Sequence, residues 1–364
     1  MVTQTANSPS PGTLRVADFW LALLLSISAH SAIASDINAV LDHAMQKQSI
    51  PGVSAVVIHD HRVVFSGGRG LADIASGRPM DDRTVMYIGS LSKVLTAVLA
   101  LQEVERGRLT LGDHLEQQRA ITVQHLITHQ SGLNMEGAFD YWFTGKFPDV
   151  AALAAYLADA PLRFEPGTDI RYSNIGYAAL GNFVAQRAGE DFEALLRDRV
   201  LEPLAMNDSG ARGPAPAVAT AYSPPGQLLP DRDRPFAGVG ASVAGRHIRM
   251  YHDADAMSPA FGAYSTAHDM GKFVRFVLGC GGDEVLSQEM RERMYEPVVS
   301  NRGLGLRIES LDGRRVARHG GWFAAYRSHL LLEPTQGIGI VVLTNSDSAS
   351  TGEIADMLYR ALLP

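Results

Sequence analysis

The alternation of apolar and polar residues predicts strands at both ends of the chain. Near the N-terminus, the runs at 52–58 (GVSAVVI) and 62–65 (RVVF) predict two strands joined as a hairpin at Asp60-His61, which Gly67, Gly68 and Gly70 end. Near the C-terminus, strands are predicted at 304–309, 315–319, 328–332 and 338–344, with Asp312-Gly313 as a hairpin turn. One antiparallel sheet made from both chain ends accommodates all of these strands.

Helical spacing dominates the residues between these strands. It predicts helices at 36–48, from Gly89 to about Arg106, at 149–158, 177–188, 192–200, 266–277 and 352–363, and a helical region that begins at 122–128. Residues 207–240 are rich in Pro, Gly and Ala and are predicted as loops. The predicted fold is α+β: an antiparallel sheet flanked by helices, with a mostly helical subdomain inserted at about 110–250 in a domain spanning 35–364.

The stretch 84–102 (TVMYIGSLSKVLTAVLALQ) contains a single charge, Lys93. Its helix is apolar on every side after Gly89, so we expect it to be buried, where an unpaired ammonium is costly. Ser90 lies three residues earlier and therefore on the same helical face. A hydroxyl beside a desolvated amine is typical of an activated nucleophile. The alternative is a lysine whose head reaches solvent.

Two further segments offer polar groups at places where a ligand could approach. Tyr172-Ser173-Asn174 lies on an extended segment that enters a helix, so Tyr172 and Asn174 point the same way. Taken alone, Asn174 is more simply explained as the N-cap of that helix. His319-Gly320-Gly321-Trp322 lies at the end of a predicted strand, and its glycines allow close approach of a ligand or form a turn.

Two histidines spaced for one helical face, His125 and His129, could bind a metal. The spacing provides no third ligand, and HLITH lacks the glutamate of an H-E-x-x-H site, so we expect structural roles for both. Cys280 is the only cysteine, which excludes an intrachain disulfide, and nothing around it indicates a nucleophile. We expect no metal or organic cofactor.

Composition narrows the class of partner. The 364 residues are 46% hydrophobic and 20% charged, which is typical of a globular protein, and the net charge of -7 disfavours nucleic acid. Only four lysines occur (Lys47, Lys93, Lys146 and Lys272), so a lysine inside an apolar helix is unlikely to be accidental.

Residues 1–34 are predicted to form a disordered leader that ends in a signal peptide. The apolar run 19–27 (FWLALLLSI) precedes Ala32-Ile33-Ala34, an A-x-A cleavage site before Ser35. A periplasmic or secreted protein is therefore expected. The alternatives are an uncleaved anchor, which would bring membrane contact, and a misassigned start codon.

Together, Ser90-Leu91-Ser92-Lys93, Tyr172-Ser173-Asn174 and His319-Gly320-Gly321 resemble the three motifs of the serine β-lactamase and penicillin-binding-protein superfamily. Because its first residue is a tyrosine, the second motif resembles that of the class C branch. This branch also includes esterases, D-Ala-D-Ala carboxypeptidases and D-aminopeptidases. The segments 121–133, 164–167, 264–266 and 342–345 fit the same branch. The third motif departs from Lys-Thr-Gly: His319 replaces the lysine with an imidazole that is only partly charged near neutrality.

The resemblance implies a serine hydrolase that acts through an acyl-enzyme on an ester or a D-amino-acid peptide. Ser90 would be the nucleophile and Lys93 with Tyr172 the coupled base. Asn174 and His319 would position the substrate, and Gly320 and Gly321 would leave room for it to bind. The amides of Ser90 and Trp322 would form the oxyanion hole. A class C β-lactamase is the first alternative, and a penicillin- or acyl-binding sensor without turnover is the second.

Overall fold

The computed structural model describes residues 33–212, 217–223, 239–243, 246–249 and 253–363. Its centre is a seven-stranded antiparallel sheet in the order β3-β2-β1-β12-β11-β10-β9. The strands are β1 (Gly52–His59), β2 (Arg62–Asp73), β3 (Arg78–Pro79), β9 (Arg307–Leu311), β10 (Arg314–Phe323), β11 (Tyr326–Glu333) and β12 (Ile338–Thr344). The N-terminal β1 pairs directly with the C-terminal β12, so the predicted α+β sheet built from both chain ends is confirmed.

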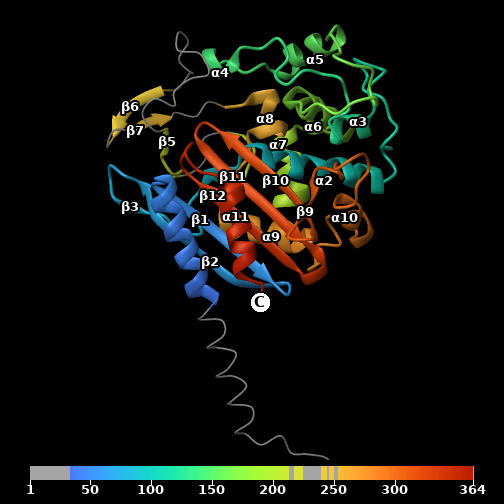
Figure 1. The fold of residues 1–364 in the computed structure, drawn as a ribbon. Helices are drawn as coiled ribbons and strands as arrows, with labels where there is room; N and C mark the ends of the chain where they lie inside the picture. Colours follow the sequence, from blue (N-terminus) through green and yellow to red (C-terminus); the bar gives the residue numbers. More distant parts are fainter. Residues whose placement is uncertain (1–32, 213–216, 224–238, 244–245, 250–252, 364) are drawn as a thin grey trace, which may run out of the picture.

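Helices cover both faces of this sheet (Figure 1). The helix at 33–48 and α11 (Thr351–Ala361) pack on one face, against side chains such as Val53 and Ile340. The buried α2 (Ser92–Glu105) and α9 (Ala267–Val277) lie on the other, with Val56 and Val341 in their core. Because successive side chains of a strand point to opposite faces, the unbroken apolar runs of β1 and β12 serve both cores.

The remaining elements lie mainly beyond the α2 face of the sheet. They are β4 (Met86–Tyr87), η1 (Gly89–Leu91), α3 (Val123–Ile127), α4 (Tyr141–Thr144), α5 (Val150–Ala158), α6 (Asn174–Ala188), α7 (Phe192–Leu196), η2 (Arg197–Leu201), β5 (Ala221–Ser223), β6 (Val239–Val243), β7 (Arg246–Arg249), η3 (Asp255–Met257), α8 (Ser258–Phe261), β8 (Tyr264–Ser265), α10 (Gln288–Met294) and η4 (Pro334–Gln336). The boundaries of a separate helical subdomain at about 110–250 stay a prediction.

The prediction that Gly67, Gly68 and Gly70 end the second strand is wrong, because β2 continues through them to Asp73. The reason is close approach of backbones. A Cβ atom on Gly68 would lie 2.6 Å from the carbonyl carbon and oxygen of Met80, so only glycine lets that segment pass.

Two further differences concern the C-terminal half. β10 extends to Phe323, so the His319 segment lies inside a strand and not at its end. The region predicted as loops at 207–240 contains β5, and β6 begins within it. The predicted leader 1–32 lies outside the described residues. Within the described part of the chain, no helix is both long enough and apolar enough to cross a bilayer.

Candidate active site

Ser90 lies in the short helix η1, directly before α2, and Lys93 lies in the first turn of α2. Gly89 precedes the serine with φ of +52°, a left-handed conformation that favours glycine. A Cβ atom there would lie 2.6 Å from the backbone nitrogen of Trp322 on β10. The glycine therefore lets the serine turn lie directly against the strand that carries the third motif.

Lys93 is completely buried, as its apolar helix predicts. Its Nζ donates to the Ser90 hydroxyl at 3.1 Å, to Asn174 Oδ1 at 2.8 Å and to the Ala260 carbonyl at 2.7 Å. Burial holds the pKa of Lys93 well below its usual range, and the Glu136 carboxylate opposes this in part. These contacts exclude the alternative of a lysine head in solvent.

Tyr172 and Asn174 lie on the other side of the serine. The Tyr172 hydroxyl hydrogen-bonds with the Ser90 hydroxyl, and burial raises the pKa of this phenol. Lys93 Nζ lies 4.8 Å from the centroid of the tyrosine ring. The interpretation of Asn174 as an N-cap is wrong: Ser173 caps α6 by accepting from the Gly176 amide, and Asn174 is the first helical residue. Its amide is therefore available to Lys93.

Glu136, which the sequence did not single out, completes this side of the site. Its carboxylate accepts from Asn174 Nδ2 at 2.8 Å and from the Tyr141 hydroxyl. It reaches the site from the loop that follows α3, where no spacing relative to the three motifs marks it. An acidic group thus lies two hydrogen bonds away from the Lys93 amine.

The third motif forms the wall opposite α2. Gly321 lies so close to the serine turn that a Cβ atom on it would be 2.2 Å from the Ile88 carbonyl oxygen and 3.1 Å from the Ser90 nitrogen. The Trp322 indole donates to Asp347 at 2.6 Å and lies 5.1 Å from the ring of Trp142 on α4. Gly320 lines two hollows, one with Tyr172 and His319 and the other with Ser90 and Trp322. Six of the eight predicted site residues therefore line the two parts of this cleft, and the other two, Lys93 and Asn174, are buried beside Ser90.

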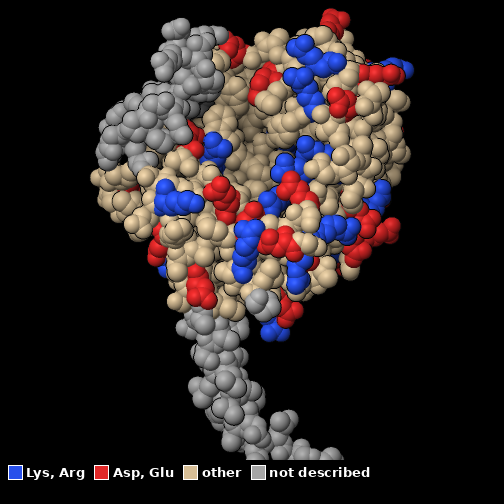
Figure 2. All heavy atoms as spheres, viewed as in Figure 1, with Lys and Arg blue, Asp and Glu red and all other residues tan. Residues whose placement is uncertain are grey.

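The cleft opens on the face seen in Figure 2, where Lys and Arg side chains gather around a hollow between the upper helices and the sheet. A pocket of about 420 Å³ beside Tyr172 and His319 is lined by Arg302, Arg307 and Arg318. Arg307 is paired with Glu309 at 2.6 Å and Arg318 with Asp356 at 2.7 Å. Within the described residues, Arg302 makes no ion pair, so its guanidinium is available to a ligand.

The surroundings of the half-buried His319 disfavour protonation of its ring. Burial beside Lys93 and Arg302 lowers the pKa of His319 to about 3, well under the 6.5 of a free imidazole. This direction favours the neutral form over the partly charged imidazole expected from the sequence. Positive charge at this end of the cleft comes from the arginines instead.

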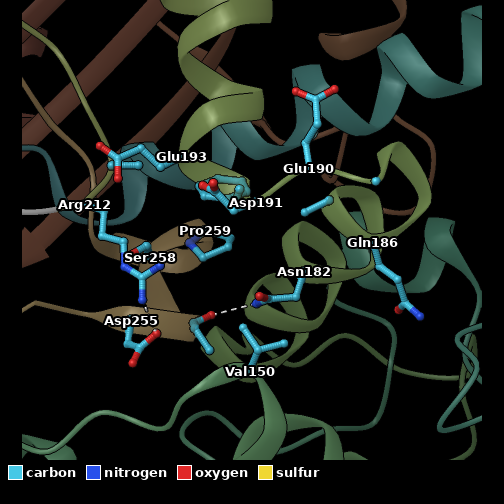
Figure 3. Close-up of a pocket in the computed structure, with 15 residues that line it drawn as sticks. Val150, Asn182, Gln186, Glu190, Asp191, Glu193, Arg212, Asp255, Ser258 and Pro259 are labelled. Atoms are coloured by element: carbon cyan, nitrogen blue, oxygen red, sulfur yellow. Dashed lines mark hydrogen bonds and ion pairs between the residues drawn. The ribbon is translucent and has the colours of Figure 1, made fainter.

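A second hollow of about 380 Å³ lies behind α8, between α6 and α7 (Figure 3). Glu190, Asp191, Glu193 and Asp255 surround it, and Arg212 pairs with Asp255 at 2.8 Å. It contains none of the eight predicted site residues. Its apolar wall includes Pro259, the neighbour of the residue whose carbonyl binds Lys93.

The described cleft therefore offers a hydroxyl hydrogen-bonded to a buried amine, a phenol on the same hydroxyl, and cations at one end. This arrangement suits nucleophilic attack on a carbonyl and needs no metal ion for proton transfer. His125 and His129 do not share a site: His125 Nδ1 accepts from the Thr122 amide, and His129 contacts the Tyr172 segment.

Comparisons with known proteins agree with this geometry. A family model described as "Beta-lactamase" matches residues 37–363. Esterase EstB of Burkholderia gladioli is 26% identical over 358 residues, which cover 87% of this chain and 91% of the esterase. Penicillin-binding protein 4 of Amycolatopsis lactamdurans is 26% identical over 88% of this chain and 87% of its own length.

A solved structure shares the fold. The D-amino acid amidase of Ochrobactrum anthropi SV3, in complex with L-phenylalanine amide, superposes with a TM-score of 0.78 at 21% identity. The alignment covers 91% of this chain and 98% of the amidase. Family match, fold and the ordered motifs agree: the chain belongs to the β-lactamase family of hydrolases.

Proposed function

We propose that this protein is a serine hydrolase that forms an acyl-enzyme on Ser90 and acts on an ester or a D-amino-acid amide or peptide. The observation that carries the proposal is the bond from Lys93 Nζ to Ser90 Oγ, 3.1 Å long and made by an amine of strongly lowered pKa. A neutral amine at that distance can accept the serine proton directly.

Acylation follows from these contacts. Ser90 Oγ attacks the carbonyl carbon of the substrate while its proton passes to Lys93 Nζ. The Tyr172 phenol, which is neutral because its pKa is raised, then gives its proton to the leaving atom and regains one from Lys93. The amide of Ser90, with that of Trp322, is proposed to stabilise the oxyanion. Water, deprotonated by the same pair, would release the acyl group.

Glu136 favours an acyl group that carries an ammonium. Its carboxylate accepts from the Asn174 amide, whose oxygen accepts from Lys93. An α-amine of a D-aminoacyl group could pair with it through a charge-assisted hydrogen bond. The solved structure that shares the fold is named a D-amino acid amidase, and that name indicates substrates of this class.

The arginine-lined pocket supports a second candidate, a leaving group that carries a carboxylate. A peptide C-terminus or a β-lactam would present that charge, and Arg302 offers the unpaired guanidinium to meet it. Because His319 occupies the position of the lysine in Lys-Thr-Gly, we rank β-lactam hydrolysis below ester and peptide hydrolysis as the proposed activity.

The decisive experiment is a substrate panel of p-nitrophenyl acetate, D-phenylalanine amide, a D-Ala-D-Ala peptide and nitrocefin. We expect turnover of the ester or of a D-amino-acid substrate. Stable acylation without release would instead favour the sensor. Export stays a proposal, which N-terminal sequencing of secreted protein would test.

Two variants test the assigned chemistry. Ser90→Ala should abolish labelling by a fluorophosphonate, and Lys93→Met should reduce kcat at least about 100-fold because the proton acceptor is lost. Lys146→Met, which removes a lysine outside the cleft, is the matched control and should keep full activity. Labelling of the Ser90→Ala variant at the wild-type rate would overturn the proposal.

A further inference from the structure

Three successive residues, Arg171 and the first two of the tyrosine motif, contact one histidine outside the motif, His129. The carbonyl of His129 accepts the Arg171 amide at 2.8 Å, and its Nδ1 accepts the Ser173 amide at 3.2 Å. Between these bonds, its ring lies 4.4 Å from the ring of Tyr172. Each of these contacts joins segments more than 40 residues apart in the sequence, so none of them is part of a local turn.

The histidine is itself firmly held. It is 4% exposed, and its other neighbour is the ring of Tyr177 at 5.0 Å, whose hydroxyl donates to the Ile127 carbonyl. Its backbone has φ of +62°, an uncommon conformation for a residue with a Cβ atom. The chain leaves α3 through this strained residue, which turns the imidazole toward the tyrosine motif.

The bond to Ser173 also fixes the chemical state of the ring. An imidazole nitrogen that accepts a hydrogen bond carries no proton, so His129 must be neutral with its proton on Nε2. Burial and the nearby guanidinium of Arg302 lower the pKa of His129, which agrees with this state. A protonated ring would turn a donor toward the Ser173 amide and break the contact.

We infer that His129 is a positioning residue, which holds Tyr172 against Ser90 by clamping the backbone on both sides of the phenol and stacking on its ring. The inference rests on the proposed function in one respect, the proton transfer that the proposal assigns to Tyr172. A phenol that must exchange a proton with Ser90 needs sub-ångström placement, and a misplacement of about 1 Å can cost 100-fold in rate. The clamp supplies that placement from outside the three motifs.

The test is His129→Gly, which removes the ring, tolerates the positive φ and leaves a cavity of imidazole size. We expect kcat to fall about 10- to 100-fold while KM changes less than about threefold, because placement of the phenol is lost and not substrate binding. Added imidazole should restore kcat, since it can stack and accept. Pyrrole, an aromatic ring without an acceptor nitrogen, should not restore it.

The matched control is His125→Gly, the same substitution one helical turn earlier. His125 accepts from the Thr122 amide and lies against Gly167, away from Tyr172. This variant should lose stability, because glycine weakens a helix, yet keep kcat. If His129→Gly does not fold, His129→Phe keeps the ring volume and removes the acceptor; kcat equal to wild type in His129→Phe would overturn the inference.

A crystal structure of His129→Gly separates this inference from the proposed function. We expect the Tyr172 hydroxyl to leave hydrogen-bond distance of Ser90 Oγ and to return when imidazole is bound. A tyrosine that stays in place without the ring would overturn the inference, whatever the activity. A displaced tyrosine together with full turnover by Ser90→Ala would instead overturn the proposed function and leave the positioning role intact.

Discussion

Lys93 shows how far a single residue's charge depends on the groups around it. Three acceptors hold the amine, and the Glu136 carboxylate raises the pKa of Lys93 against the larger effect of burial. Glu136 therefore has two effects in the cleft. It is proposed to attract a substrate cation, and it raises the pH at which Lys93 becomes neutral.

Glu136→Gln separates these effects by pH and by substrate. Removal of the carboxylate should lower the pKa of Lys93, so the acid limb of kcat/KM for a neutral ester should shift to lower pH. For an ester with an α-ammonium group, kcat/KM at pH 8 should also fall about 10-fold or more, because a charge-assisted hydrogen bond is lost. Pre-steady-state kinetics on the ester pair across pH 5–9 would measure both.

Glu165→Gln provides the control for that experiment, because Glu165 is an exposed carboxylate on the segment before Tyr172. It should change neither the pH profile nor the preference between the two esters. An acid limb that moves to higher pH in Glu136→Gln would contradict the assigned electrostatics.

Part of the residue-scale chemistry could be predicted from the sequence. Ser90 and Lys93 are three positions apart on one helix, so their contact follows from helical geometry alone. Asn174 was ambiguous because Ser173 and Asn174 are both good caps, and only the fold shows which one takes the Gly176 amide. Glu136 and His129 reach the cleft through loop conformations that no periodicity reports.

At the scale of elements, the cleft depends on how closely η1 approaches β10. Two glycines with positive φ flank this region of the chain, Gly89 before α2 and Gly107 after it. They differ in their surroundings: a Cβ atom on Gly89 would overlap the Trp322 backbone, whereas one on Gly107 would meet nothing within 4 Å.

Gly89→Ala should therefore cost about 2 kcal/mol or more of unfolding free energy and should also reduce kcat, since β10 must move away from Ser90. Gly107→Ala should cost only about 1 kcal/mol, the penalty of a left-handed alanine, and keep full activity. Urea denaturation and turnover of the best substrate would measure both variants. Equal losses in the two variants would show that conformation alone, and not contact with β10, makes Gly89 necessary.

The same contrast explains why elements were easier to predict than their ends. Apolar runs located β1 and β12, because both faces of these strands are buried. The glycines of β2 were interpreted as a strand end, because the sequence does not show that Met80 passes over Gly68. In the sequence alone, a glycine that a neighbouring backbone requires cannot be distinguished from a glycine that ends a strand.

For the whole molecule, buried neutral histidines make stability sensitive to acid. His329 is 8% exposed, and burial with the nearby cations of Arg318 and Arg307 lowers its pKa to about 3. In the unfolded chain it would titrate near 6.5. Because the unfolded state binds the proton more readily, stability is fully present above pH 6.5 and is lost as the pH falls toward 3.

The expected slope from this one residue is about 1.4 kcal/mol per pH unit between pH 6 and 4. His329→Gln should reduce the slope by that amount, although it should also lower stability at pH 7 through lost packing. Urea midpoints of both proteins at four pH values would measure the difference. Parallel pH dependences of the two proteins would rule out His329 as a source of acid sensitivity.

The pairing of β1 with β12 has a consequence for synthesis of the protein. β1 emerges from the ribosome early, but its partner is among the last strands to be made. At 5–20 residues per second, the interval is on the order of tens of seconds, during which the edge of β1 that faces away from β2 has no strand to pair with. The sheet, and with it the wall of the cleft opposite Ser90, can close only after translation is nearly complete. A chaperone that shields this edge would therefore raise the yield of active protein and would leave the free energy of unfolding of the finished protein unchanged.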